Sequence, residues 1–148
     1  TGQVATVAGP LQFGPGGIAI DKQGNLYVVD QGSFRIRKIT PEGEVSTFAG
    51  SGSPGDKEGN AEEAQFSLNM RDIVVDDQGN LYLADENRIR KITPQGIVST
   101  IAGSTFGYRD GDGASAKFFS PNGLGIDKQG NIYVADENNN RIRKISFE

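Results

Sequence analysis

The chain repeats one pattern of short apolar runs three times. Residues 17–30, 72–85 and 123–136 each place two such runs around Asp-x-Gln-Gly-Asn, and each is followed by Arg-Ile-Arg-Lys-Ile. A period of about 50 residues built from short strands is typical of a β-propeller, in which each repeat forms one blade. Propellers close with about 4–8 blades. Three blades would therefore leave two sheet faces without a neighbour.

Each repeat is expected to fold as a meander of four strands. In the first repeat, strands are predicted at residues 18–20, 26–29, 35–40 and 44–49. Asp21 and Gly24 suit the tight turn between the first two strands, because glycine accepts a positive φ and aspartate bonds nearby backbone amides. The second strand is apolar on both faces, as in sheets that are buried on both sides. The predicted fold class is all-β, a β-propeller with three four-stranded blades per chain.

The fourth strand of the third repeat has its counterpart at the other end of the chain. Residues 44–50 (EVSTFAG) and 97–103 (IVSTIAG) provide this strand in the first two repeats, and residues 3–9 read QVATVAG. We expect a homodimer that closes one six-bladed ring, because pairing two chains covers both open faces. The expected single half-propeller domain, residues 1–148, has blade repeats at about 10–50, 51–103 and 104–148, with strand 1–9 supplied by the partner chain.

The repeats resemble those of the NHL-repeat family. The resemblance rests on residues 79–85 with 87–92, on residues 130–136 with 140–145, and on the run 110–127 (DGDGASAKFFSPNGLGID). It covers nearly the whole chain and implies a propeller that commonly has six blades. The family includes enzymes, RNA binders and protein-binding modules, so the resemblance implies a fold and leaves the function open.

Composition argues against several functional classes. The chain has no Cys and no His, which removes the usual zinc ligands and the commonest general base. Its formal net charge of −4 argues against a general nucleic-acid binder. No apolar run approaches the roughly 18 residues of a membrane span. We therefore expect no catalytic residues, no cofactor, no metal and no membrane partner.

A ligand site is expected at one mouth of the central channel. The links between the second and third strands share this face with the long inserts 51–65 and 104–117, whose closing Phe66 and Phe118 are expected between adjacent blades. Loop residues that break the repeat are the candidates, because a rigid scaffold presents them. In addition to Met70, the predicted ligand-binding residues are Phe34, Arg71, Asp72, Tyr108, Arg109 and Asn122. The expected ligand is a protein or a small molecule.

Three patterns of charged residues allow a structural or a functional interpretation. Asp30, Asp85 and Asp136 each precede an arginine (Arg35, Arg88, Arg141), and recurrence in every repeat favours a structural ion pair. We expect the Arg-Ile-Arg-Lys-Ile strands to form the solvated outer region of each blade rather than a surface that binds phosphate. Asp110 and Asp112 could hold calcium, although the full calcium-loop pattern is absent and the motif is common in such links.

Three functions remain open at this stage. The first is a non-enzymatic β-propeller scaffold or binding module that self-assembles by dimerisation into a six-bladed ring. The second is an engineered or natural propeller fragment with no activity beyond self-association. The third is a metal-dependent, lactonase-like hydrolase with an ion in the channel, held by Glu, Asn and Asp.

Overall fold

The computed structural model describes residues 1–11 and 14–147, and the strands among these residues form three antiparallel sheets. The first sheet contains β1 (Pro15–Ile20), β2 (Leu26–Asp30), β3 (Arg35–Ile39) and β4 (Val45–Ala49). The second contains β5 (Met70–Val75), β6 (Leu81–Asp85), β7 (Arg88–Ile92) and β8 (Val98–Gly103). The third contains β9 (Pro121–Ile126), β10 (Ile132–Asp136) and β11 (Arg141–Ile145). Short 3-10 turns, η1 (Gln31–Ser33) and η2 (Glu137–Asn139), join the second and third strands in sheets one and three.

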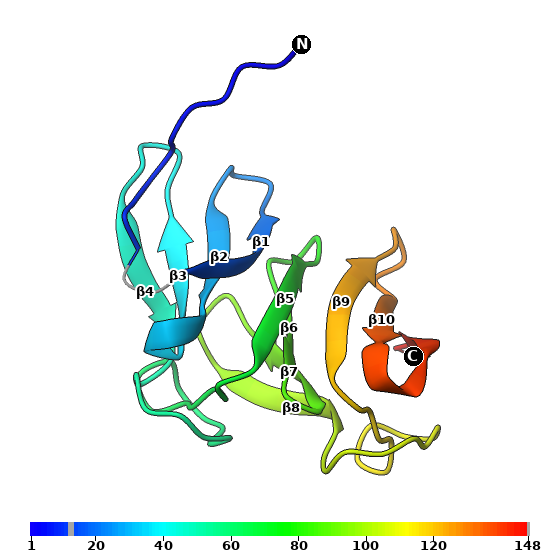
Figure 1. The fold of residues 1–148 in the computed structure, drawn as a ribbon. Coiled ribbons are helices and arrows are strands. Elements are labelled where there is room, and N and C mark those ends of the chain that lie inside the picture. The colour runs from blue at the N-terminus through cyan, green and yellow to red at the C-terminus, as the bar shows by residue number, and fades with distance from the viewer. Residues whose placement is uncertain (12–13, 148) are drawn as a thin grey trace.

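The sheets stand side by side in chain order, as blades of a propeller arc (Figure 1). Each is a simple meander, and β5 lies between β1 and β9. The first strand of every blade is therefore the innermost one. The expected all-β blades are confirmed, and the first two have four strands. The third has three among the described residues, with β11 at its outer edge.

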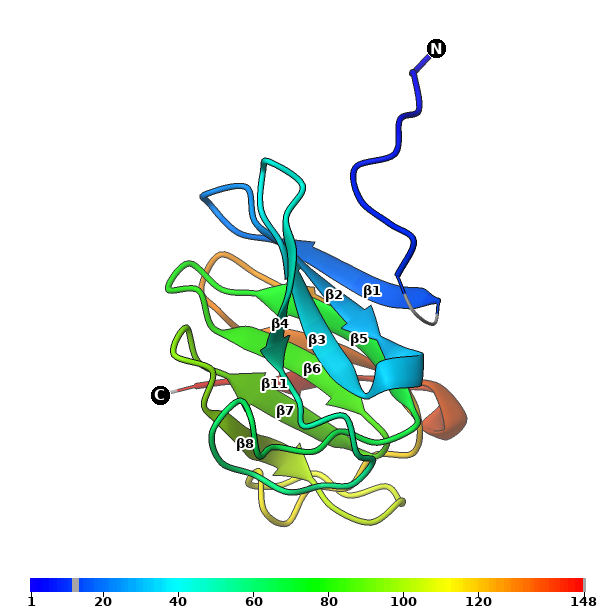
Figure 2. The ribbon, with the colours of Figure 1, turned by 90° about the vertical axis from the view of Figure 1, so that its left-hand side faces the viewer.

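The N-terminal segment lies apart from the third blade. It leaves the first blade and projects beyond it, whereas the C-terminus lies beside the third blade at the other end of the arc (Figures 1 and 2). Residues 1–9 form no strand in this structure. The side chain of Val4 is 100% exposed, although its counterparts in the repeat belong to β4 and β8.

Apolar faces of neighbouring blades pack into two cores. Tyr27, Val29 and Ile36 of the first blade meet Ile73 and Leu83 of the second. The other face of the second blade packs in the same way on the third. Phe66 is buried in the first core and Phe118 in the second, which confirms their expected position between blades. Met70, expected as a loop residue, is fully buried at the start of β5.

The recurring ion pair uses a different arginine from the one expected. Asp30 and Arg35 are opposite each other in the β2–β3 ladder, but the Asp30 carboxylate pairs with Arg37 at 2.9 Å. Arg35 instead donates to the carbonyl of Ser51. Residues two apart on a strand share a face, so the second arginine can reach back to the same carboxylate. The equivalent pairs are Asp85–Arg90 at 2.9 Å and Asp136–Arg143 at 2.8 Å.

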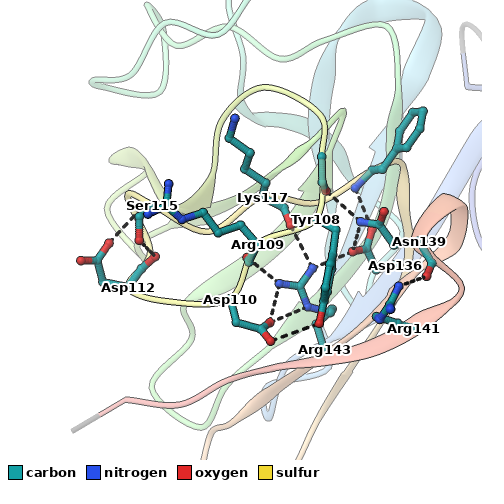
Figure 3. A network of polar contacts seen from close by, with 12 residues as sticks. Tyr108, Arg109, Asp110, Asp112, Ser115, Lys117, Asp136, Asn139, Arg141 and Arg143 are labelled. Carbon is teal, nitrogen blue, oxygen red and sulfur yellow. Dashed lines mark hydrogen bonds and ion pairs between the residues drawn. The ribbon is translucent and has the colours of Figure 1, made fainter.

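The central arginines of β7 and β11 are buried, which corrects the expectation of a solvated strand. Arg90 also donates to the carbonyls of Gln65 (3.0 Å) and Lys57 (3.2 Å) in the preceding link. Arg143 does the same with Lys117 (2.9 Å) and Arg109 (2.7 Å), as Figure 3 shows. A buried cation is tolerated when charges and hydrogen bonds satisfy it. These arginines therefore tie each long link to its own blade.

Replacing Arg90 with Met is expected to lower the free energy of unfolding by about 3–5 kcal/mol, because it leaves the buried Asp85 carboxylate without its partner. Urea unfolding followed by circular dichroism measures this loss. Arg37→Met should cost less, because Arg37 is partly exposed and bonds side chains of its own blade rather than a link. Adding Asp85→Leu to Arg90→Met should recover part of the loss. A single Arg90→Met variant within about 0.5 kcal/mol of the parent would contradict this assignment.

Candidate functional site

A small hollow lies between the second and third blades, on the face that carries the links and inserts. Its volume is about 170 Å³. We call it the mouth pocket. It is lined by Asn69, Arg71, Glu86, Asn87, Phe106, Phe119, Ser120 and Pro121.

Two strand starts and one turn position the polar groups of the mouth pocket. Arg71 is the second residue of β5 and is exposed, while Met70 before it is buried. The side-chain oxygen of Asn87 accepts a hydrogen bond from the Ser120 amide at 3.0 Å, which joins the β6–β7 turn to the third blade. Glu86 is exposed beside it, and its amide donates to the carbonyl of Asn69 at 3.1 Å. The pocket therefore has a rigid polar rim built by both blades.

The backbone of Glu86 is left-handed, with φ of 57°. Such a conformation in a residue other than glycine can mark a functional site. Phe34 and Asn140 adopt the same conformation at the corresponding ends of η1 and η2, with φ of 57° and 53°. The conformation therefore belongs to the repeat and is not by itself a sign of binding.

Two phenylalanines form the apolar wall of the mouth pocket. The ring centroids of Phe106 and Phe119 are 5.2 Å apart. The two side chains are 64% and 37% exposed, although aromatic rings usually bury most of their surface. Exposed rings beside one arginine and one glutamate can bind a group that is apolar on one side and charged on the other.

The predicted site residues do not form one cluster. Arg71 lines the mouth pocket, and Asn122 is exposed on β9 beside the lining residue Pro121. The Asp72 carboxylate accepts hydrogen bonds from the amides of Leu124 and Ile73, both at 2.9 Å. Asp72 thus joins β5 to β9 and has a structural role.

Tyr108 and Arg109 lie at a different place, against the third blade. The Tyr108 ring centroid lies 4.0 Å from the Arg141 guanidinium carbon, and the Arg109 carbonyl accepts from Arg143 (Figure 3). Phe34 ends the η1 link of the first blade. None of these three residues lines the mouth pocket.

The predicted ligand-binding residues do not include Phe106, Phe119 or Glu86, although the sequence places Glu86 on this face as part of the link between the second and third strands. A usable signal was present, because the two long links align through matching bonds: Gly55 to Phe66 and Gly107 to Phe118. In that alignment Phe106 and Phe119 stand where the preceding link has Pro54 and Ser67. Two aromatic residues thus break the repeat at one place.

The hairpins of the opposite face use their carboxylates within their own turns. Asp127 accepts from the amides of Gln129 and Asn131, both at 2.9 Å, and from the Asn131 side chain. These bonds, the Asn131 side chain foremost, lower the pKa of Asp127. In the second blade, burial and, after it, the nearby Asp76 carboxylate together raise the pKa of Tyr82 to about 12. The turns have little bonding capacity left for a ligand.

The Asp110 and Asp112 carboxylates do not converge on one point. Asp110 pairs with Arg143 at 2.7 Å, whereas Asp112 accepts from the Ser115 amide at 2.9 Å (Figure 3). A guanidinium thus occupies the place that a cation would take, which does not fit the calcium interpretation. Within residues 1–11 and 14–147, no three His, Cys, Asp or Glu side chains are grouped as a metal site. The same residues contain no helix long and apolar enough to cross a membrane.

The repeat is similar to one found in known proteins. Residues 118–145 match the profile of the NHL repeat. The chain is 30% identical over 147 residues to SUPPRESSOR OF QUENCHING 1 of Arabidopsis thaliana, covering 90% of this chain and 14% of that protein. It is 27% identical over 128 residues to human NHL repeat-containing protein 3, covering 80% of this chain and 34% of that protein. The chain therefore spans a small part of these relatives.

A solved structure shows the same architecture. An auxiliary nutrient binding protein from Bacteroides thetaiotaomicron is 27% identical, with a TM-score of 0.76. The match covers 87% of this chain and 36% of that chain. Its blades are therefore similar to the three described above.

Acid is expected to destabilise the hairpins. Because the pKa of Asp127 is lower in the folded chain than its ordinary value of 3.8, its contribution to stability is present above that pH and is lost as pH falls through the folded pKa. Asp127→Asn should therefore lose less stability than the parent between about pH 6 and about pH 2.5, measured by urea unfolding. Asp77→Asn is the control, because the exposed Asp77 pairs with Lys22 rather than with a turn. Equal pH dependence in the parent and Asp127→Asn would contradict the prediction.

Proposed function

The chain belongs to the NHL-repeat family, and on that premise we propose that it is a non-enzymatic β-propeller binding module. A second copy completes its ring of six blades, and a ligand binds at the mouth pocket. The observation that carries the proposal is the pair of open apolar blade faces at the two ends of the arc.

The open faces present residues that are buried elsewhere in the repeat. Ile142 of the third blade is 73% exposed, whereas its counterpart Ile89 is fully buried against the next blade. Ile18 of the first blade is 56% exposed, and its counterpart Ile73 is 1% exposed. The third blade thus offers the face that packs forward, and the first offers the face that receives it. A second copy can satisfy both, because two such contacts close a ring.

Strand exchange would complete the third blade. Residues 3–9 repeat the sequence of β4 and β8, and the described part of the third sheet ends at β11. Supplied by the partner, this segment would cover the outer edge of β11, which otherwise exposes unpaired backbone groups.

The mouth pocket favours a ligand with an apolar part and an anionic group. Phe106 and Phe119 offer exposed rings, and Arg71 offers a guanidinium that can donate to a carboxylate or phosphate. A protein segment or a small molecule can meet these requirements. The printed name of one similar structure, an auxiliary nutrient binding protein, supports binding as the activity.

The proposal that the chain is not an enzyme rests on its side chains. It has no His and no Cys, and Glu86 is the acidic residue among those that line the mouth pocket. Turnover of a lactone or ester that a chelator abolishes, or stoichiometric metal in elemental analysis, would contradict this part of the proposal.

The chain is expected to sediment as a dimer, at twice the monomer mass of 15.8 kDa. Ile142→Lys and Ile18→Lys should shift it toward monomer, because each places a charge in a face that the partner covers. Ile97→Lys is the matched control, since Ile97 is exposed in the β7–β8 turn, away from both open faces. If the parent chain is a folded monomer at every concentration tested, the proposed ring is wrong, whatever the variants show.

Arg71→Ala and Phe106→Ala are each expected to weaken ligand binding about tenfold or more. A hydrogen bond from a charged group contributes about 1.5–3 kcal/mol, and covering an exposed phenylalanine ring contributes about as much. Labelled protein is applied to a peptide and glycan array, and the affinity of each hit is then measured with the variants. Lys22→Ala and Lys128→Ala are the controls, because both lie in hairpins on the opposite face. Loss of binding in these controls alone would place the site on the other side of the ring.

A further inference from the structure

A groove of 570 Å³ runs along the outer edge of β11. Ala102 of β8 lines one side, Gly111 and Asp110 of the preceding link line another, and Arg143 and Ile145 lie along β11. This is where the first two blades carry their fourth strands, β4 and β8. The groove therefore has the position of a missing strand.

The first two blades agree on how a fourth strand pairs. In the β7–β8 ladder, Val98 is opposite Ile92, Thr100 opposite Arg90 and Ala102 opposite Ile89. The β3–β4 ladder has the same pairs: Val45 with Ile39, Thr47 with Arg37 and Ala49 with Ile36, with a register shift at the same step. Two independent copies thus define one register for the third blade.

The link before the second blade holds the other edge of β8. The amide and carbonyl of Gly59 bond those of Val98, at 3.0 and 2.8 Å. The Glu58 carboxylate accepts from the Thr100 amide at 2.8 Å. Through the alignment of the two links, Asp110 and Gly111 are the counterparts of Glu58 and Gly59. A fourth strand is therefore held along both edges.

We propose that this groove binds residues 3–8 of a second copy in one register. Both β11 and the link before the third blade form hydrogen bonds with the segment. Val4 lies opposite Ile145, Thr6 opposite Arg143, and Ala8 opposite Ile142. Gly111 pairs with the Val4 backbone. Asp110 accepts from the Thr6 amide, in place of one of its contacts with Arg143. This inference rests on the proposed ring and adds the residues that bind the incoming strand and fix its register.

The segment cannot come from the same molecule. Six Cα-to-Cα steps join Gly9 to Pro15, the first residue of β1, and they span at most about 22 Å when extended. Stacked sheets lie about 10 Å apart, so the third blade is about 20 Å from the first, and the three strand spacings from the innermost to the outermost strand add about 14 Å across the blade. The two together exceed the reach of the linker. A second copy is the occupant that the geometry favours.

Cysteine cross-linking tests the register, because the chain has no Cys of its own. Val4→Cys on one tagged copy and Ile145→Cys on another should form a mixed disulfide. Val4→Cys with Lys144→Cys should not, because a shift of one residue turns the side chain to the other face of the sheet. Equal yields from both pairs, or none from the first, would overturn the register.

Side-chain size at the groove is tested by making the same substitution at two positions of the segment, Ala8 and Ala5. The counterparts of Ala8 are the buried Ala49 and Ala102, so Ala8→Leu should weaken dimerisation about tenfold or more. Ala5→Leu is the matched control, because its counterparts Ser46 and Ser99 are not buried. Both changes lie in a segment that is unpaired in the free chain, so folding is unaffected. Equal dimer affinity in the two variants would overturn the proposed reading of the strand.

Failure of this inference is distinguishable from failure of the ring. A dimer that gives no Val4–Ile145 cross-link keeps the ring and overturns the groove. If the chain is monomeric, a synthetic peptide of residues 2–9 with Val4→Cys is offered to the Ile145→Cys chain. A cross-link to the peptide then supports the groove without the ring, and its absence overturns both.

Discussion

The second and third blades depend on the bonds of one buried arginine each, Arg90 of β7 and Arg143 of β11. Arg90 and Arg143 each join the carboxylate that ends the second strand to the carbonyls of the preceding link. Removing a guanidinium from water is costly unless all of these partners are in place. The long links contain little regular structure, so these bonds fix their path. The same bonds position Phe66 and Phe118, which pack between adjacent blades.

The sequence predicts the blades well because their signals are local. Apolar runs and Asp-x-Gln-Gly-Asn turns give the strand ends of the first blade within one residue, except that β1 begins three residues before its predicted start. It does not identify the arginine that pairs with Asp85, because Arg88 and Arg90 share a face and the choice depends on the position of the link. The candidate site is predicted poorly for the same reason. Tyr108 and Arg71 both break the repeat, but the fold of the link separates them, and it brings Phe106 to Phe119.

The mouth pocket and the open faces are separate parts of the proposed ring. The pocket lies between the second and third blades, both present in one chain, so its shape does not require a partner. The ring would place two such pockets around one channel. Binding and assembly can therefore be separated by substitution, since Arg71 and Ile142 lie on different surfaces.

The hairpin turns and the buried arginines differ in how far along the chain they reach. The Asp21 carboxylate bonds groups two to six residues away, whereas Arg90 bonds carbonyls 25 and 33 residues away. Contacts that are close in sequence form early in folding, and distant ones must first close a long loop. We therefore expect each blade to fold from its turn outward, with the buried arginine bonding the link last. On that order, loss of the arginine speeds unfolding more than it slows folding.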